Sequence, residues 1–134
     1  SPALAALHPI RTPADFLQVP LLVQSRRRDA WERWFRLTSV NHDEPLNPAS
    51  IAHFLMLAQA VAAGAGAALL PTFMIEAELA AGTLIVPLDL PLIEDRSYYL
   101  VYPIENLERS AVRQVRDFIC EEAQAYFSPT RTPI

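Results

Sequence analysis

The chain has 134 residues, of which 51% are hydrophobic and 19% charged, and its formal net charge is −4. This length and composition allow one ordinary domain with a buried core and exclude a disordered chain. A single cysteine excludes an internal disulfide framework. No apolar run reaches the roughly 20 residues that a membrane-spanning helix needs, so we expect no membrane partner.

The first elements alternate between helix and strand. Thr12, Pro13 and Asp15 fit the cap, first and third positions of a short helix. Residues 20–24 form an apolar run typical of a buried strand. Asp29 is suited to begin the next helix, in which one face carries Trp31, Trp34, Phe35 and Thr38. We interpret this aromatic face as core rather than as a ligand platform.

The charges are unevenly distributed along the chain. All 11 basic residues are arginines; residues 51–95 contain five acidic residues and no basic one. A protein that neutralises many phosphates needs a clustered positive face. The only cluster, Arg26, Arg27 and Arg28, is followed at once by Asp29 and Glu32. We therefore interpret it as a solvated loop and helix start rather than as a DNA contact.

Residues 39–48 form a polar loop in which His42, Asp43 and Glu44 suggest a metal site. Three adjacent loop residues cannot easily all face one ion, and no second histidine or cysteine cluster supports them. We therefore expect no metal.

The middle of the chain alternates again. Residues 50–52 predict a short strand that runs into a helix over 53–63, apolar nearly all round and hence buried on most sides. Gly64 suits a left-handed position after that helix. Residues 66–70 predict a central strand, and residues 72–81 a helix that ends at Gly82.

The last part predicts two strands, over residues 83–86 and 98–102, and then a long helix capped by Ser110. One face of this helix is apolar, and Cys120 is expected to be a small packed side chain rather than a nucleophile. Residues 128–134 are predicted to be a frayed end. The apolar face comprises Val112, Val115, Ile119, Ala123 and Tyr126.

Alternating strands and helices predict an α/β domain with a mostly parallel sheet and helices on both faces. Ligands bind such sheets at the carboxyl ends of the strands, beside helix N-termini. His53 and Phe54 stand where a strand becomes a helix, and the free N–H groups there favour an anion. The alternative is a helix-capping histidine without a ligand. With no cation in residues 51–95, an anion would depend on amides, hydroxyls and His53, or on cations from elsewhere.

No motif points to an enzyme or a cofactor. The segment Gly64-Ala65-Gly66 lacks the third glycine of a dinucleotide-binding fingerprint, because Leu69 occupies that position, and it ends a helix instead of opening one. The chain has no lysine, which excludes a phosphate-binding loop. We expect neither catalysis nor a bound cofactor.

Five segments, in order, resemble the LysR-type transcriptional regulators, and in particular the subgroup of glycine-cleavage and β-lactamase gene activators. One is residues 59–71 (QAVAAGAGAALLP), which is similar to the family's A-x-x-G-x-G-hydrophobic-Pro segment. The others are residues 8–16 (HPIRTPADF), 29–35 (DAWERWF), 79–87 (LAAGTLIVP) and 98–103 (YYLVYP), the last followed by the closing helix.

This resemblance implies a periplasmic-binding-protein-like (type 2) effector domain, of which the chain would hold a Rossmann-like lobe. Residues 1–101 would form effector-domain lobe two. Residues 102–134 would contain the end of a hinge strand, a C-terminal helix belonging to lobe one, and the tail. The resemblance begins partway into the effector domain, so the N-terminal winged helix-turn-helix that binds DNA is expected outside this sequence.

The resemblance also implies a site. Pocket residues in such regulators come from the turn that matches Ile51, Ala52, His53 and Phe54. Tyr98 matches a tyrosine that opens the closing strand, where its hydroxyl could bond a ligand. Ser1 and Pro2 match the start of lobe two, near the hinge.

The expected function is therefore ligand sensing and dimerisation in a cytoplasmic bacterial regulator, with a small, anionic effector bound between two lobes. DNA would be a partner only through the winged helix-turn-helix. Because the apolar face of the last helix would lack lobe one, we expect a homodimer or higher oligomer. The alternatives are a solute-binding protein domain of the same fold and a small enzyme.

Overall fold

The computed structural model describes residues 1–93 and 98–127, so the predicted frayed tail, residues 128–134, lies outside the described residues. The chain forms two compact units, which we call unit 1 (residues 1–93) and unit 2 (residues 94–134). Each unit is described by itself.

Unit 1 is built on a three-stranded parallel sheet with the order β2-β1-β3. The strands are β1 (Leu21–Gln24), β2 (Ala49–Ile51) and β3 (Ala67–Ala68). The parallel sheet was predicted, but the prediction of a central strand over residues 66–70 is wrong. β2 and β3 pair on either side of β1, so β1 is central and β3 is a two-residue edge.

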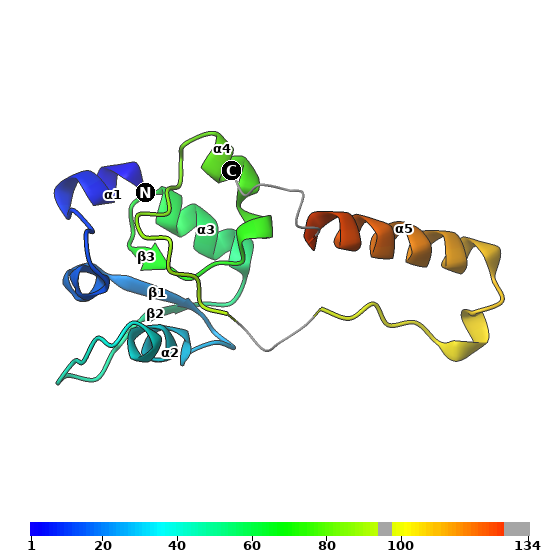
Figure 1. Cartoon of the computed structure of the whole chain (residues 1–134), viewed down its shortest axis with the longest axis horizontal. Helices are drawn as coiled ribbons and strands as arrows, with labels where there is room; N and C mark the ends of the chain where they lie inside the picture. The colour runs from blue at the N-terminus through cyan, green and yellow to red at the C-terminus, as the bar shows by residue number, and fades with distance from the viewer. Residues whose placement is uncertain (94–97, 128–134) are drawn as a thin grey trace. The chain divides into compact units, whose positions relative to one another are not determined.

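Helices cover both faces of this sheet, as predicted. Helix α2 (Ala30–Leu37) lies on one side of the strands and helix α3 (Phe54–Ala62) on the other (Figure 1). Because side chains alternate along a strand, Val23 joins the core on the α2 side and Leu22 the core on the α3 side.

The predicted aromatic face of α2 forms the first core. Trp31, Trp34 and Phe35 are at most 3% exposed and their rings contact one another, and both indoles also contact Phe16, all at centroid separations of 5.3 to 5.7 Å. The indole Nε1 of Trp31 donates to the carbonyl of Leu22 at 2.9 Å. These residues are therefore core, with the one polar atom of each buried indole satisfied.

The second indole connects α2 to the end of unit 1. Nε1 of Trp34 donates to the carbonyl of Leu90 at 2.7 Å. Leu88 and Leu92, on either side, pack against the same aromatic core. Residues 88–92 are thereby held against α2 although they contain no regular secondary structure.

Two short helices precede β1. They are α1 (Pro2–Leu7) and a 3₁₀ helix, η1 (Pro13–Gln18), where a short helix was predicted. Thr12 caps η1, and the Asp15 carboxylate accepts the backbone N–H groups of Arg11 and Thr12 at 2.9 and 2.8 Å. These two hydrogen bonds favour the ionised carboxylate and so lower the pKa of Asp15 below 3.8.

The turn from α3 to β3 depends on two glycines. Gly64 has a φ of 84°, the left-handed conformation predicted after α3. A Cβ placed on Gly66 would lie 2.3 Å from the carbonyl oxygen of Pro20, so only glycine lets β3 approach the start of β1.

The segment after β3 differs from the prediction. The helix expected over residues 72–81 is divided into η2 (Thr72–Met74) and α4 (Glu76–Ala80) at Ile75, whose side chain is buried in the second core. The strand predicted over residues 83–86 is absent. The backbone N–H groups of Thr83 and Leu84 both donate to the carbonyl of Glu78, so they cap α4 instead of joining the sheet.

Unit 2 contains a 3₁₀ helix, η3 (Ile104–Asn106), and α5 (Ser110–Phe127), the predicted long helix. The strand predicted over residues 98–102 is wrong: these residues have no regular secondary structure, because no strand among the described residues pairs with them.

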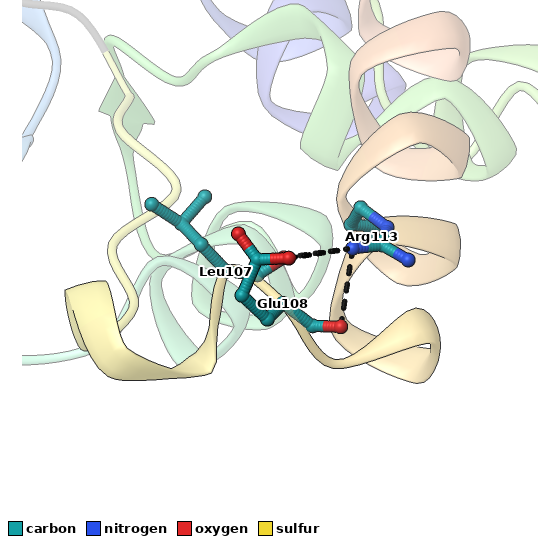
Figure 2. Close-up of polar contacts among 3 residues, drawn as sticks. All are labelled: Leu107, Glu108 and Arg113. Carbon is teal, nitrogen blue, oxygen red and sulfur yellow. Dashed lines mark hydrogen bonds and ion pairs between the residues drawn. The ribbon is translucent and has the colours of Figure 1, made fainter.

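Arg113 stabilises the turn before α5 through contacts with Glu108. Figure 2 shows Arg113 reaching back from the first turns of the helix to Glu108. Its guanidinium donates to the carbonyl of Glu108 at 3.1 Å and lies 3.7 Å from the Glu108 carboxylate. Further along α5, hydrogen bonds with Asp117 and Tyr102 raise the pKa of Arg116.

The apolar side of α5 remains largely exposed. Val115 is 57% exposed and Phe118 63%. Cys120 is exposed as well, as are Phe118 and Ile119 beside it on α5, so its prediction as a packed side chain is wrong. Among the described residues, no helix is both long and apolar enough to cross a membrane.

Candidate functional site

The carboxyl ends of β1 and β2 lie side by side, because Gln24 and Ile51 are paired in the sheet. The turns that follow are joined by hydrogen bonds. Nε2 of Gln24 donates to the carbonyl of Ala52 at 2.8 Å, and the N–H of Ser25 donates to the carbonyl of Ile51 at 3.0 Å. The edge at which ligands bind α/β sheets is thus formed by two linked loops.

Arg27, in the loop that follows β1, contacts the start of α3. Its guanidinium carbon lies 5.4 Å from the centre of the Phe54 ring, within the range of a cation–π interaction. The interpretation of Arg26 and Arg28 as solvated fits, because both are exposed. For Arg27 it is incomplete, because this residue supplies the positive charge that residues 51–95 lack.

The sequence contained a signal for this contact. Arg27 follows the end of β1 as Phe54 follows the end of β2, so parallel pairing of the two strands brings their following loops together. The order of elements alone does not state which strands are neighbours. For this reason the arginine was not assigned to the site.

Helix α3 begins at this edge without a capping hydrogen bond from its N-cap side chain. His53 is the N-cap residue, but its side chain is exposed and makes no capping hydrogen bond. The first turn contains no acidic residue. The partial positive charge of the helix N-terminus is therefore not neutralised by the helix's own side chains.

Large apolar side chains are exposed in the same turn. Leu55 is 66% exposed and Met56 is 59% exposed. The prediction that α3 is buried on most sides is therefore wrong. The sheet covers only the side that carries Leu57, Ala58 and Val61.

Ser1 and Pro2 lie at the other end of α3. Ser1 is the N-cap of α1, and its Oγ accepts the N–H of Leu4 at 3.3 Å. The same Oγ lies 3.6 Å from the position that a Cβ on Gly64 would take. The nine residues of α3 span about 14 Å, so unit 1 does not bring Ser1 and Pro2 together with His53 and Phe54.

Tyr98, the remaining predicted site residue, belongs to unit 2 and is 66% exposed. Unit 2 also contains an almost wholly apolar groove between the residues before η3 and the first turns of α5. It is lined by Leu100, Tyr102, Ala111, Val112, Val115 and Arg116.

The predicted polar loop has no metal-binding arrangement. In residues 1–93 and 98–127, no group of three histidine, cysteine, aspartate or glutamate side chains could hold a metal ion. His42 instead contacts the Phe35 ring, and its Nδ1 lies 2.8 Å from the carbonyl oxygen of Glu44.

Known proteins identify the family. Residues 1–124 match the LysR substrate binding domain. The chain is 31% identical over 117 residues to the glycine cleavage system transcriptional activator of Escherichia coli K12, covering 87% of this chain and 38% of the relative. It is 35% identical over 114 residues to the HTH-type transcriptional activator AmpR of Citrobacter koseri, covering 85% of this chain and 39% of the relative.

A solved structure agrees with this family. The effector domain of the transcriptional regulator AmpR of Pseudomonas aeruginosa superposes with a TM-score of 0.72 at 26% identity, over 93% of this chain and 59% of that domain. The two curated relatives are transcriptional regulators, and the chain spans less than half of their length. The expected periplasmic-binding-protein-like α/β fold is confirmed. The chain belongs to the LysR substrate binding domain family, as an effector-binding domain of a LysR-type regulator.

Proposed function

We propose that this chain senses a small anionic effector at the carboxyl edge of β1 and β2. The observation that carries the proposal is the position of Arg27, whose guanidinium lies 5.4 Å from the Phe54 ring at the first turn of α3. An anion there would meet a cation, the open N–H groups of the helix and the exposed imidazole of His53.

Ile51, Ala52, His53 and Phe54 form the centre of this proposed site. Tyr98 is proposed as a further contact through its hydroxyl, contributed by unit 2. Ser1 and Pro2 receive less support, because they lie at the far end of α3. Their proposed place is near the hinge rather than against the anion.

The domain organisation is part of the proposal. Residues 1–101 would form lobe two of the effector domain and residues 102–134 a hinge strand end, the helix α5 of lobe one, and the tail. The exposed apolar side of α5 supports this assignment, because the helix lacks a core of its own. The effector would bind between the lobes and shift their relative angle.

The proposed whole protein is a cytoplasmic homodimer that binds DNA through an N-terminal winged helix-turn-helix. Effector binding would change its affinity for an operator by a coupling free energy of about 1–3 kcal/mol. Its relatives are transcriptional activators. No catalytic step is proposed.

The experiment is a thermal-shift screen of small carboxylic acids and amino acids against the complete protein, followed by Arg27→Gln. A binding anion raises the melting temperature by mass action. Loss of a charge-assisted hydrogen bond should weaken that ligand about 10- to 100-fold. Arg36→Gln, which removes an exposed arginine from the other end of α2, is the matched control. Equal affinity in Arg27→Gln and the parent protein would refute the site.

A further inference from the structure

The chain leaves unit 1 through residues 88–92, which we call the strap. The carbonyl of Leu90, in the middle of the strap, accepts the indole N–H of Trp34 at 2.7 Å, and this bond joins the strap to helix α2. Unit 1 ends at Ile93, directly after the strap. Through the covalent chain, a movement of unit 2 therefore acts on the strap before it acts on any other part of unit 1.

The Trp34 side of this bond is fixed by the first core. Its side chain is 3% exposed, and its ring contacts those of Phe16, Trp31 and Phe35 at centroid separations of 5.3 to 5.6 Å. None of these rings belongs to the strap. The indole would therefore stay in place when the strap leaves, as a buried donor that has lost its acceptor, and this cost favours return of the strap.

The strap side of the bond is held by few contacts. The strap has no regular secondary structure, and its Leu90 N–H donates to the carbonyl of Leu88, within the strap itself. Leu88 and Leu92 are partly buried against the first core, and Leu90 is 44% exposed. Opening of the strap thus costs the Trp34 bond and the burial of two leucine side chains, and it breaks no pairing between the strands.

The other indole of α2 has an acceptor of the opposite kind. Nε1 of Trp31 donates to the carbonyl of Leu22, a residue of the central strand β1. Leu22 is paired with Ala49 on one side and with Ala68 on the other. Release of the Trp31 bond requires α2 to leave the sheet, which is close to unfolding unit 1. Local openings need less free energy than global unfolding, so the two indole bonds should open to different extents.

We propose that the strap is a conformational latch. It opens from Trp34 and closes on it while the rest of unit 1 stays folded, and in the closed state it restrains unit 2 relative to α2. This restraint would act on the effector-driven change of lobe angle, a part of the inference that rests on the proposed function. Because the latch itself needs no ligand, it is tested on the chain without an effector, so failure of the latch and failure of the anion site are separate results.

Hydrogen exchange of the two indole N–H groups measures the opening, because it compares the same chemical group twice in one helix. In NMR spectra of the 134-residue chain, the Trp34 N–H should exchange at least about tenfold faster than that of Trp31. Low concentrations of urea should accelerate exchange at Trp31 strongly and at Trp34 weakly, because opening of the strap exposes little surface.

Three single variants separate opening of the strap from unfolding of unit 1. Leu92→Ala should raise the Trp34 rate about tenfold, because a partly buried leucine loses its contacts. Val61→Ala, in the second core, should raise the Trp31 rate about tenfold and leave the Trp34 rate unchanged. Ile93→Ala removes a side chain that is 80% exposed just after the strap; it is the matched control and should change neither rate.

Nuclear relaxation of backbone ¹⁵N measures the restraint on unit 2. The triple variant Trp34→Phe, Leu88→Ala and Leu92→Ala keeps an aromatic ring in the core and removes the latch bond with both leucine contacts. In this variant the rotational correlation time of α5 should fall relative to that of unit 1, and in Ile93→Ala it should not change. The double variant Leu88→Ala and Leu92→Ala keeps both indoles and should give a smaller fall.

Three results would overturn the inference. Equal exchange rates and equal urea dependence of the two indole N–H groups would mean that the strap does not open by itself. A rise of the Trp34 rate in Val61→Ala that equals the rise at Trp31 would mean the same. An unchanged relative correlation time of α5 in both the triple and the double variant would mean that the strap does not restrain unit 2.

Discussion

Units 1 and 2 both contain helices with apolar faces, but only one of them buries those faces. Every buried apolar side chain among the described residues lies between Phe16 and Leu84, in unit 1. In unit 2 the helix α5, with 18 residues, is the longest helix among the described residues, and its Val115, Phe118 and Ile119 side chains are exposed. Length and amphipathic pattern therefore do not reveal whether a helix has its own core.

Different kinds of contact stabilise the two units internally. Helix α3 has nine residues, too few for a stable isolated helix, and is fixed by contacts with β1 and the second core. Unit 2 depends on contacts close in sequence, such as that between Arg113 and Glu108 (Figure 2). Unit 1 should thus unfold cooperatively. The stability of unit 2 should depend mainly on substitutions at residues close in sequence to one another.

The largest expected effect compares one residue type in the two units. Phe35→Ala empties a site that is fully buried and should lower the free energy of unfolding by about 3–5 kcal/mol. Phe118→Ala, on the exposed side of α5, should change it by less than about 0.5 kcal/mol. Urea unfolding of the 134-residue chain measures both. Equal losses would mean that the face of α5 is covered in solution.

A smaller effect on stability is expected at Gly66, the glycine that directly precedes β3. Gly66→Ala would place a Cβ against the carbonyl of Pro20 and should cost about 1–3 kcal/mol by forcing β3 from β1. Gly82→Ala meets no neighbour within 4 Å but keeps a φ of 69°, so it should cost about 1 kcal/mol. Amide exchange should rise in β1 of Gly66→Ala and remain unchanged in α5. Faster exchange in α5 would show that the units unfold together.

The smallest effect is electrostatic and depends on pH. The pKa of Asp15 is lower in the folded chain than its usual value of 3.8, because two backbone N–H groups stabilise the carboxylate. Its contribution to stability is therefore present at neutral pH and is lost as the pH falls below 3.8 through the folded pKa. Asp15→Asn should lower the urea midpoint at neutral pH, and the difference should disappear in acid. A difference that persists in acid would show that the side chain acts without its charge.

Much of unit 1 could be predicted from local pattern. The Thr12 cap, the aromatic face of α2, the β2–α3 turn and the left-handed Gly64 all follow from residue chemistry within a few positions. Strands were predicted over residues 83–86 and 98–102, but neither segment forms one. A strand requires a paired neighbour, and local pattern does not show whether one is present. The β-favouring residues of these two segments have no such partner among the described residues.

The proposed site depends on two kinds of information. The prediction of His53 and Phe54 as site residues uses the order of strand and helix, which is local information. The contact of Arg27 with Phe54 was not predicted, because it depends on which two strands pair. The exposure of Leu55 and Met56 was also not predicted. An apolar helix that packs on a small sheet has more hydrophobic surface than the sheet can cover.

The distribution of aromatic residues has an optical consequence. Both tryptophans of the chain, Trp31 and Trp34, lie in the first core of unit 1, whereas all four tyrosines lie in residues 94–134. Fluorescence excited at the red edge of indole absorption therefore originates from unit 1 alone, and tyrosine difference absorbance originates from unit 2. The two units can be followed separately in one cuvette, without any label.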